Sequence, residues 1–451
     1  MKKYLVVFVI IGLLFISGCK EKNTHECTEG TWVFPEGTKC LEEVMAELVC
    51  NECGKAFEVA PKKKSHNITI EEKEATCSED GYYLEKCSDC DLRYEITYEK
   101  TGEHKFVYEI YTEATDNKLG VKQQICEVCN LEGNLVKYAN NGFSDHGKLS
   151  VVGPDLVDEQ GEKFQLVGIS THGIQWFSKY VNYATFDALH NEFGINVIRL
   201  ALYTAEGGYC EAEPDRKEFL YQKVVEGIKA ATELDMYVIV DWHMVGAEDP
   251  ADKNPMTYRN EAMEFFGRIT EEFKDYDNIL YEIMNEPNGD TTWESCKTYA
   301  NLVIPVIRQN TDAIILVGNP QWTSNLNVVM KDPLVGYENI MYTHHFYANG
   351  HTNQEQIKNA YDKGFPVFVS EHGGMESSGD GPIDYDSLKN WYDVLEKRNI
   401  SYVAWNLSNS KGSASILKQE TTSLTDFSDE ALKEWGVWYK AWVRKKFGFT
   451  R

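Results

Sequence analysis

The chain has 451 residues, of which 42% are hydrophobic and 12% aromatic, so it can bury a large core and can hold more than one domain. Its 45 basic and 71 acidic residues give a formal net charge of −26. This charge repels nucleic acid and anionic membrane surfaces, and it favours a neutral partner such as a glycan.

Residues 1–18 predict a secretory signal peptide. The charged start, MKK, is followed by an uncharged apolar run over residues 4–16, which is too short to span a bilayer comfortably. The run closes with the letters ISGC, ending at Cys19, which resembles the lipobox of bacterial lipoproteins. We therefore expect an exported protein anchored at the bacterial cell surface by a lipid on Cys19. The alternative is an ordinary signal peptide with a chance cysteine.

Residues 19–140 form a cysteine-rich segment with an internal repeat. Nine of the 12 cysteines fall between Cys27 and Cys129. The pattern C-x9-C-x2-C followed by a histidine occurs twice, with shifts of 37, 37, 37 and 38 residues: Cys40, Cys50, Cys53 and His66, then Cys77, Cys87, Cys90 and His104. A third copy is degraded, because it has Cys126 and Cys129 but Thr115 stands near the place of the first cysteine.

Each complete copy predicts a structural zinc site, because three thiolates and one imidazole make a closed tetrahedral set. The alternative is that an exported chain pairs these cysteines as disulfides. Three cysteines per copy would leave an odd thiol, and the histidine has no function in a disulfide, so zinc is favoured. Modules of about 40 residues are too small to fold without a bound metal or disulfides. They resemble the zinc-ribbon-like repeats of surface proteins from anaerobic bacteria, and we expect a stalk or adhesion segment.

Residues 141–451 predict an α/β fold, a (β/α)8 TIM barrel. The segment from Gly147 begins with two short alternating strands, expected to form a hairpin across the bottom of the barrel. Apolar strand-like runs then alternate with amphipathic helical stretches eight times. These runs cover residues 166–170, 196–202, 236–241, 279–284, 313–317, 340–343, 366–370 and 402–405. Eight such units in about 300 residues are typical of a TIM barrel.

Two glutamates stand where predicted strands end. Glu286 follows the run at 279–284, and Glu371 follows the run at 366–370. Active sites of TIM barrels lie at the carboxyl ends of the strands. Paired carboxylates there suit glycoside hydrolysis, in which one group transfers a proton and the other attacks the anomeric carbon. A single glutamate would be more simply a solvated charge, but the pair favours catalysis.

Further polar and aromatic residues lie in or shortly after the predicted strands. They are His172, Trp176, Arg199, Tyr203, His243, Asn285, Trp322, His345, Tyr347 and Trp405. The three tryptophans offer flat apolar faces to sugar rings, although core packing is the alternative for each. Cys210 and Cys296 have no metal-ligand spacing and are expected to be buried thiols.

Seven motifs occur in order: THGIQWF, VIRLALYTAEGGY, VIVDWH, IMNEPNG, HHFYANGH, FVSEHGG and WNLSN. From about Gly147 to Phe447 the chain closely resembles glycoside hydrolase family 5, and within it the bacterial endoglucanases. The resemblance implies a retaining endo-β-1,4-glucanase acting on β-glucan without a catalytic cofactor, with Glu286 as acid/base and Glu371 as nucleophile. It also implies a polar shell of Arg199, His243, Asn285, His345 and Tyr347, and Trp405 as the sugar platform.

Two positions depart from the family pattern. His372 stands where the family has a tryptophan after the nucleophile, and the lysine expected after WNLSN is displaced to Lys411. These differences concern contacts to outer sugar rings rather than the catalytic pair. The alternatives are a β-mannanase or a mixed-linkage glucanase on the same barrel, or a surface glycan-binding protein that lost catalysis. We expect a monomer.

Overall fold

The computed structural model describes residues 27–112, 114, 120–138, 141–246 and 250–447. The predicted signal peptide and Cys19 lie outside this range. The chain divides into two compact units, residues 1–105 with 126–131, and residues 106–125 with 132–451. None of the helices in the described ranges is long and apolar enough to cross a membrane.

The second unit contains a closed barrel of eight parallel strands, which confirms the predicted TIM barrel. The strands follow one another in chain order, and the last pairs with the first. They are β12 (Val167–Thr171), β13 (Val197–Tyr203), β14 (Tyr237–His243), β15 (Ile279–Glu282), β16 (Ile315–Val317), β17 (Ile340–Tyr347), β18 (Val367–Gly373) and β19 (Tyr402–Leu407). Every strand residue is buried, because helices cover the outer face and side chains fill the interior.

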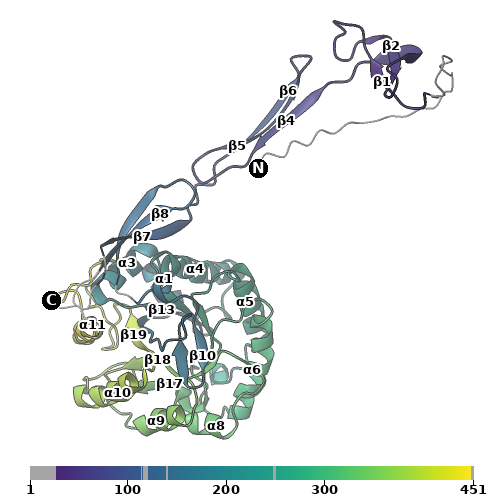
Figure 1. The fold of residues 1–451 in the computed structure, drawn as a ribbon. Coiled ribbons are helices and arrows are strands. Elements are labelled where there is room, and N and C mark those ends of the chain that lie inside the picture. The colour runs from purple at the N-terminus through teal and green to yellow at the C-terminus, as the bar shows by residue number, and fades with distance from the viewer. Residues whose placement is uncertain (1–26, 113, 115–119, 139–140, 247–249, 448–451) are drawn as a thin grey trace. The chain divides into compact units, whose positions relative to one another are not determined.

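Helices surround the barrel as a ring (Figure 1). The longer ones are α3 (Tyr183–Phe193), α4 (Pro214–Glu233), α5 (Arg259–Glu272), α6 (Trp293–Ile307), α9 (Gln354–Asp362), α10 (Tyr385–Arg398) and α11 (Glu434–Lys446). Shorter helical segments are α1 (Phe143–His146), α2 (Ile174–Phe177), η1 (Ser178–Tyr180), η2 (Pro250–Lys253), α7 (Pro320–Thr323) and α8 (Leu326–Lys331). Local signals set their ends: the Asn182 side chain caps α3, and Gly194 ends it with φ of 78°.

The predicted hairpin across the barrel bottom is present as β10 (Ser150–Val152) and β11 (Asp155–Val157). Leu156 of β11, with Leu149 and Phe164 on either side of the hairpin, packs in one cluster with residues at the starts of the barrel strands, such as Val197. This end of the barrel is therefore filled by apolar side chains, which leaves the carboxyl ends of the strands for the site.

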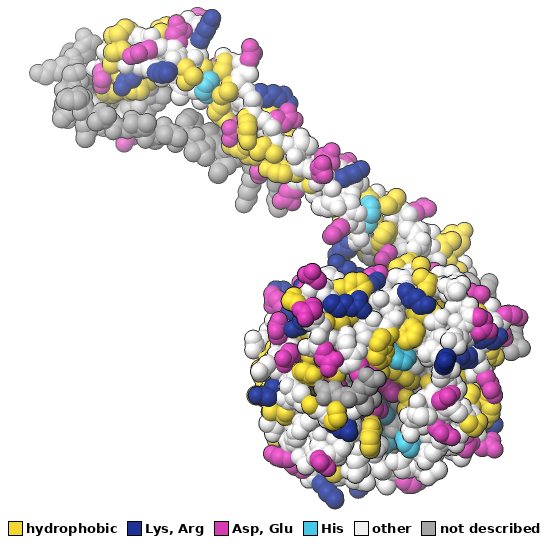
Figure 2. All heavy atoms as spheres, turned by 180° about the vertical axis from the view of Figure 1, so that it is seen from behind, with side chains coloured by type: hydrophobic (Ala, Val, Ile, Leu, Met, Phe, Trp, Pro, Cys, Tyr) yellow, Lys and Arg dark blue, Asp and Glu magenta, His cyan; other side chains and the backbone are white. Residues whose placement is uncertain are grey.

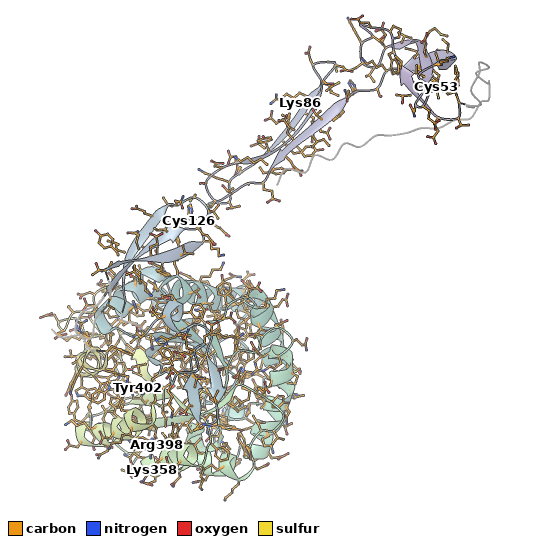
Figure 3. All side chains as sticks on the ribbon, viewed as in Figure 1. Cys53, Lys86, Cys126, Lys358, Arg398 and Tyr402 are labelled. Atoms are coloured by element: carbon orange, nitrogen blue, oxygen red, sulfur yellow. The ribbon has the colours of Figure 1, made fainter. Side chains whose placement is uncertain are left out.

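The cysteine-rich segment folds as three successive three-stranded sheets, here called modules 1, 2 and 3. Module 1 has β1 (Gly30–Val33), β2 (Glu43–Cys50) and β3 (Ala56–Lys63); module 2 has β4 (Ile68–Lys73), β5 (Gly81–Cys87) and β6 (Arg93–Tyr98); module 3 has β7 (Phe106–Thr112), β8 (Gly120–Cys126) and β9 (Glu132–Tyr138). In every module the middle strand ends at the first cysteine of a C-x2-C pair. Figure 3 labels Lys86 on β5 and Cys126 at the end of β8.

Most of module 3 belongs to the same compact unit as the barrel. The Lys122 side chain is 2% exposed, and its Nζ lies 2.7 Å from an oxygen of Asp235, just after α4. Gln124 donates to the carbonyl of Glu233 at 2.8 Å. The boundary predicted between residues 140 and 141 therefore falls inside this unit, because these buried polar contacts join strand β8 to the barrel.

Candidate active site

The two predicted catalytic glutamates lie close together at the carboxyl end of the barrel. Glu286 follows β15, and Glu371 lies in β18 on the far side of β16 and β17. One oxygen of each carboxylate and one nitrogen of His345 all lie within 4.8 Å of one another. Both carboxylates retain some exposure, 9% for Glu286 and 5% for Glu371, so a bound molecule can reach them.

Two donors hold the Glu371 carboxylate. The Tyr347 hydroxyl donates to Oε1 at 2.7 Å, and an Arg199 NH1 donates to Oε2 at 3.2 Å. Burial, with the nearby charge of Glu371, raises the pKa of Tyr347 well above its usual value, so the phenol keeps its proton. Each carboxylate oxygen thus accepts one hydrogen bond, which fixes the orientation of the Glu371 carboxylate.

Glu286 is positioned by His345, whose Nδ1 lies 2.8 Å from Oε1. The other ring nitrogen contacts the Ser370 hydroxyl at 2.9 Å, and Ser370 donates in turn to Glu282 at 2.6 Å. Burial by itself would lower the pKa of His345, but the hydrogen bonds to Glu282 and Glu286 and the charge of Glu371 raise it to about 9. At neutral pH the imidazolium therefore donates from both nitrogens.

Arg199 on β13 is the fully buried centre of the site. Its Nε donates to Glu282 at 2.7 Å, and NH2 donates to Asn285 at 2.7 Å and lies 3.0 Å from Asp241. These carboxylates, together with Glu371, hold the pKa of the guanidinium above its ordinary value although burial opposes this. A buried cation is stable only when it is paired in this way, so Arg199 orients the groups around it.

His243 forms the next layer of the network. Burial, and then the charge of Arg199, lower the pKa of His243 to about 3, so the ring is neutral. Its Nδ1 lies 2.6 Å from Asp241, and its Nε2 lies 3.3 Å from the Asn285 amide nitrogen. A neutral ring that donates from Nδ1 to Asp241 can accept at Nε2 from the Asn285 amide nitrogen. The Asn285 side chain is then bound through its nitrogen by His243 and through its oxygen by Arg199.

Aromatic rings line the mouth of the barrel. Tyr203 and Trp405 both stack on His243, with ring centroids 4.2 and 5.1 Å away. His172 is 5.2 Å from Trp405. Trp176 and Trp322 are 48% and 55% exposed, so these two rings are not core residues. The exposed rings of Trp176 and Trp322 therefore offer stacking surfaces for sugar rings.

A short strained turn presents Trp322. Gln321, Trp322 and Thr323 all have left-handed φ angles, from 53° to 63°. The Trp322 N–H donates to the Pro287 carbonyl at 3.1 Å, and the Thr323 hydroxyl donates to the Asn285 carbonyl at 2.5 Å. The turn is thus bound to the segment that carries Glu286, which holds an otherwise unfavourable backbone in place.

Comparison with known proteins agrees with this geometry. The family model for cellulase, glycosyl hydrolase family 5, matches residues 157–411. The chain belongs to glycosyl hydrolase family 5. Endoglucanase A of Butyrivibrio fibrisolvens is 44% identical over 297 residues, which cover 65% of this chain and 68% of the relative. An endoglucanase of Clostridium saccharobutylicum is 40% identical over 298 residues, which cover 65% of this chain and 64% of that one.

Solved structures match the family 5 domain as well. The catalytic domain of Thermobifida fusca endoglucanase Cel5A is 35% identical, with a TM-score of 0.63, and the match covers 67% of this chain and 99% of that one. A variant of the same domain has been solved in complex with cellotetraose. The chain is therefore a glycoside hydrolase, and its barrel carries the catalytic function.

Three residues of the family 5 site were not among the predicted ones: Asp241, Glu282 and Ser370. All three are fully buried and bind Arg199 or His345. Glu282 had a recognisable signal, because a carboxylate inside the apolar run ILYEIM must have a buried partner. Nothing in the sequence indicates that Ser370 connects His345 to Glu282.

His372, which replaces a tryptophan of the family pattern, has a structural function here. Its ring is fully buried; Nδ1 donates to the Val403 carbonyl at 2.8 Å, and Nε2 contacts the Tyr392 hydroxyl at 2.7 Å. The ring packs among Phe346, Trp435 and Tyr439 on the helix side of β18. His372 is therefore a buried core residue rather than a contact for outer sugar rings.

The predicted metal ligands of the repeats are grouped differently in the structure. Cys50 and Cys53 do not lie with Cys40 and His66, and Cys87 and Cys90 do not lie with Cys77 and His104. The groups are Cys40, His66, Cys87 and Cys90; Cys77, His104, Cys126 and Cys129; and Cys27, Cys50 and Cys53. The grouping within each repeat is thus wrong, because the first cysteine of a copy folds against the following copy. The third copy, expected to be degraded, contributes to a complete set.

Proposed function

We propose that the chain is a retaining endo-β-1,4-glucanase that hydrolyses internal bonds of cellulose or a related β-glucan. The separation of the carboxylates carries this proposal, since oxygens of Glu286 and Glu371 lie within 4.8 Å. Retaining glycosidases place their two carboxyl groups about 5 to 5.5 Å apart, whereas inverting ones need about 6.5 to 9.5 Å to admit a water. The spacing favours double displacement.

In the first step Glu371 attacks the anomeric carbon while Glu286 gives its proton to the glycosidic oxygen, and the leaving sugar departs. The product is a glycosyl ester on Glu371. In the second step Glu286 takes a proton from water, the water oxygen attacks the anomeric carbon, and Glu371 leaves as a carboxylate. Tyr347 and Arg199 stabilise that carboxylate, because both donate to it. No cofactor is required for either step.

Three observations support a β-1,4-glucan as the substrate. Relatives at 44% and 40% identity carry the name endoglucanase, and a neighbour at 35% identity binds cellotetraose. The exposed rings of Trp176 and Trp322 offer stacking faces beside the carboxylates. A glycan-binding protein without activity would have no use for the hydrogen bonds that position Glu286 and Glu371.

The test is hydrolysis of carboxymethyl cellulose, lichenan and mannan, with separation of the oligosaccharides released. We expect carboxymethyl cellulose to be cleaved to a mixture of short oligomers, and proton NMR to show the β-anomer first. Mannan as the preferred substrate would point to the mannanase alternative, and lichenan to the mixed-linkage one. An initial α-anomer would contradict double displacement, and binding without cleavage would identify a glycan-binding protein.

We also propose that the enzyme is exported, anchored at the cell surface through a lipid on Cys19, and monomeric. The support is the signal-like run before Cys19 and its lipobox-like end. Labelling of the producing cell with a radioactive fatty acid should mark the protein, and Cys19→Ser should remove the label and release the protein from membranes. Light scattering of the mature chain would test the monomer.

A further inference from the structure

Two sets of three thiols and one imidazole are assembled in the repeats. The first set is Cys40, His66, Cys87 and Cys90, and the second is Cys77, His104, Cys126 and Cys129. Within each set, all ligand atoms lie within 4.8 Å of one another. All eight residues belong to the same compact unit. Three sulfurs and one nitrogen are a closed ligand set for structural zinc.

The distances match a tetrahedral metal site rather than a disulfide. Cys40 and Cys87 have sulfurs 3.5 Å apart, and the sulfurs of Cys77 and Cys126 are 3.7 Å apart. With zinc–sulfur bonds of about 2.3 Å, tetrahedral geometry places two sulfurs about 3.8 Å apart. A disulfide requires about 2.05 Å. The thiols are therefore arranged around a common centre and not bonded in pairs.

The sulfur-to-nitrogen distances agree with the same geometry. The Cys90 sulfur lies 3.3 Å from Nδ1 of His66, and the Cys129 sulfur lies 3.4 Å from Nδ1 of His104. Zinc bonds of about 2.3 Å to sulfur and 2.0 Å to nitrogen predict about 3.5 Å for such a pair. In both sets the imidazole faces the cysteines with the same nitrogen.

The backbone around each C-x2-C pair is shaped in the same way. The N–H of Cys87 donates to the Leu92 carbonyl at 3.0 Å, and that of Cys126 donates to the Leu131 carbonyl at 2.9 Å. The Asp89 N–H donates to the Cys87 sulfur at 3.4 Å. These backbone turns hold the two sulfurs of each C-x2-C pair on the same side of the turn.

Each set takes its ligands from two consecutive modules. In module 2, His66 precedes β4 and the C-x2-C pair follows β5, while the fourth ligand, Cys40, comes from the loop after β1 of module 1. The second set repeats this plan: His104 precedes β7, the pair follows β8, and Cys77 comes from the loop after β4 of module 2. The first cysteine of a copy is therefore a ligand in the set of the next module.

This plan explains two irregularities of the repeat. The third copy has Thr115 near the place of the first cysteine, because no further copy follows that would need the ligand. Module 1 brings together Cys27, Cys50 and Cys53, with Cys27 in the place before the first strand that His66 and His104 occupy.

We propose that the two sets are structural zinc sites, each of which ties one module to the next. The modules need such a tie, because all residues of β4 and β6 are exposed and neither hydrophobic cluster of the described residues includes modules 1 and 2. Figure 2 shows hydrophobic side chains at the surface of the repeats. Ile70 is 57% exposed and Tyr94 is 54% exposed. Zinc ligation supplies the folding free energy that burial does not.

Zinc counting in paired variants of the full chain tests both the metal and the cross-module plan. The double variant Cys40→Ser with Cys87→Ser alters one set, so it should lose one zinc relative to the unaltered chain. The variant Cys77→Ser with Cys87→Ser alters both sets and should lose two. Ligand sets confined to single repeats predict the reverse, two and then one. Cys210→Ser, in the barrel, is the matched control and should lose none.

Two further measurements keep the result interpretable if a variant unfolds. Cobalt substituted into the unaltered chain should give the intense visible absorption of tetrahedral thiolate ligation. Thermal unfolding of the barrel should be the same in all variants, which shows that the losses are local. If the unaltered chain binds neither zinc nor cobalt, the proposal is overturned, whether its thiols are reduced or paired as disulfides. A loss of two zinc ions in Cys40→Ser with Cys87→Ser and of one in Cys77→Ser with Cys87→Ser would also overturn it.

Discussion

The barrel and modules 1 and 2 both gather polar side chains into clusters, but they differ in what stabilises those clusters. In the barrel, Arg199 and its partners are embedded in a large apolar core, so the fold positions the charges. In module 2, all residues of β4 and β6 are exposed, and its two thiols and imidazole gather with Cys40 of module 1. The apolar core of the barrel holds its charged groups in place for catalysis, whereas modules 1 and 2 contribute no described residue to either hydrophobic cluster.

Most of module 3 belongs to the same compact unit as the barrel and rests on it. Lys122 and Gln124 are almost fully buried, and both bind the end of α4. Asn134 also donates to the Tyr183 hydroxyl at 2.9 Å. The comparison therefore predicts that changes at the catalytic centre affect activity, that changes in modules 1 and 2 leave the barrel unaffected, and that module 3 affects barrel stability.

The largest effect is expected for Glu371→Gln, which removes the nucleophile. The amide retains the shape but cannot form the glycosyl ester, so kcat should fall by about 10⁴-fold or more. Initial rates on carboxymethyl cellulose measure this. Cys53→Ser, at an exposed position of module 1 labelled in Figure 3, is the control and should retain full activity. Residual activity near that of the unaltered enzyme would disprove the assignment of Glu371.

Glu286→Gln should reduce turnover in a way that depends on the leaving group. Without a proton donor, cellulose hydrolysis should fall by about 10³-fold, within the range of general acid catalysis. An aryl glycoside with an acidic phenol needs no proton, so its first step should be nearly unchanged and a burst of phenol should appear. Equal losses on both substrates would contradict the role of Glu286 as the acid.

Arg199→Met should harm stability and activity together. Removal of the guanidinium leaves Asp241, Glu282 and Glu371 without their shared cation, which costs about 3 to 5 kcal/mol of unfolding free energy for a buried pair. Urea unfolding measures the loss. Arg268→Met breaks an exposed ion pair with Glu218 and serves as the control, with less than about 1 kcal/mol expected. Similar losses for the two variants would show that Arg199 is not the centre of the site.

Stability should fall at alkaline pH because of His345. Its pKa in the folded protein is raised to about 9, above the ordinary value of about 6.5. The stabilisation is thus complete below pH of about 6.5 and is lost as pH rises through about 9, with a total of about 3 kcal/mol. Unfolding free energies at pH 6 and 10 for the unaltered chain and His345→Gln measure it. The difference in unfolding free energy between the unaltered chain and His345→Gln should be smaller at pH 10 than at pH 6 by about 3 kcal/mol.

His172→Gln provides the comparison for that pH dependence. Burial lowers the pKa of His172 to about 4, so its ring is neutral in the folded protein between pH 7 and 10. Its substitution should therefore leave the alkaline loss of stability unchanged. If His345→Gln retained the same alkaline loss as the unaltered chain, another group would be responsible.

The smallest effect is expected where module 3 meets the barrel. Lys122→Met leaves Asp235 buried with a partner missing, so the barrel should lose about 2 to 3 kcal/mol of stability, with kcat unchanged below the unfolding temperature. Lys86→Met, which breaks only an exposed pair with Glu71 in module 2, should leave barrel unfolding as it was. Equal unfolding temperatures for the two variants would show that module 3 does not support the barrel.

The sequence by itself determined the barrel and most of its site. Strand periodicity and the polar residues after each run identified all eight strands, Glu286, Glu371 and the residues around them, because in a TIM barrel the end of every strand faces one mouth. Local order along the chain is then enough to place a residue in the site. The same reasoning recognised three repeats, each with a C-x2-C pair.

Only the tertiary structure decided which residues share a contact. Cys40 is ten residues from Cys50 but forms a group with Cys87, 47 residues away. The spacing of the cysteines fits ligand sets within one repeat and ligand sets shared by two modules equally well, because each ligand recurs after nearly the same number of residues. Likewise, nothing local indicates that Ser370 connects His345 to Glu282, or that Lys122 reaches Asp235, 113 residues further on. A periodic sequence specifies local geometry, whereas the partners of a buried polar group depend on packing between distant segments.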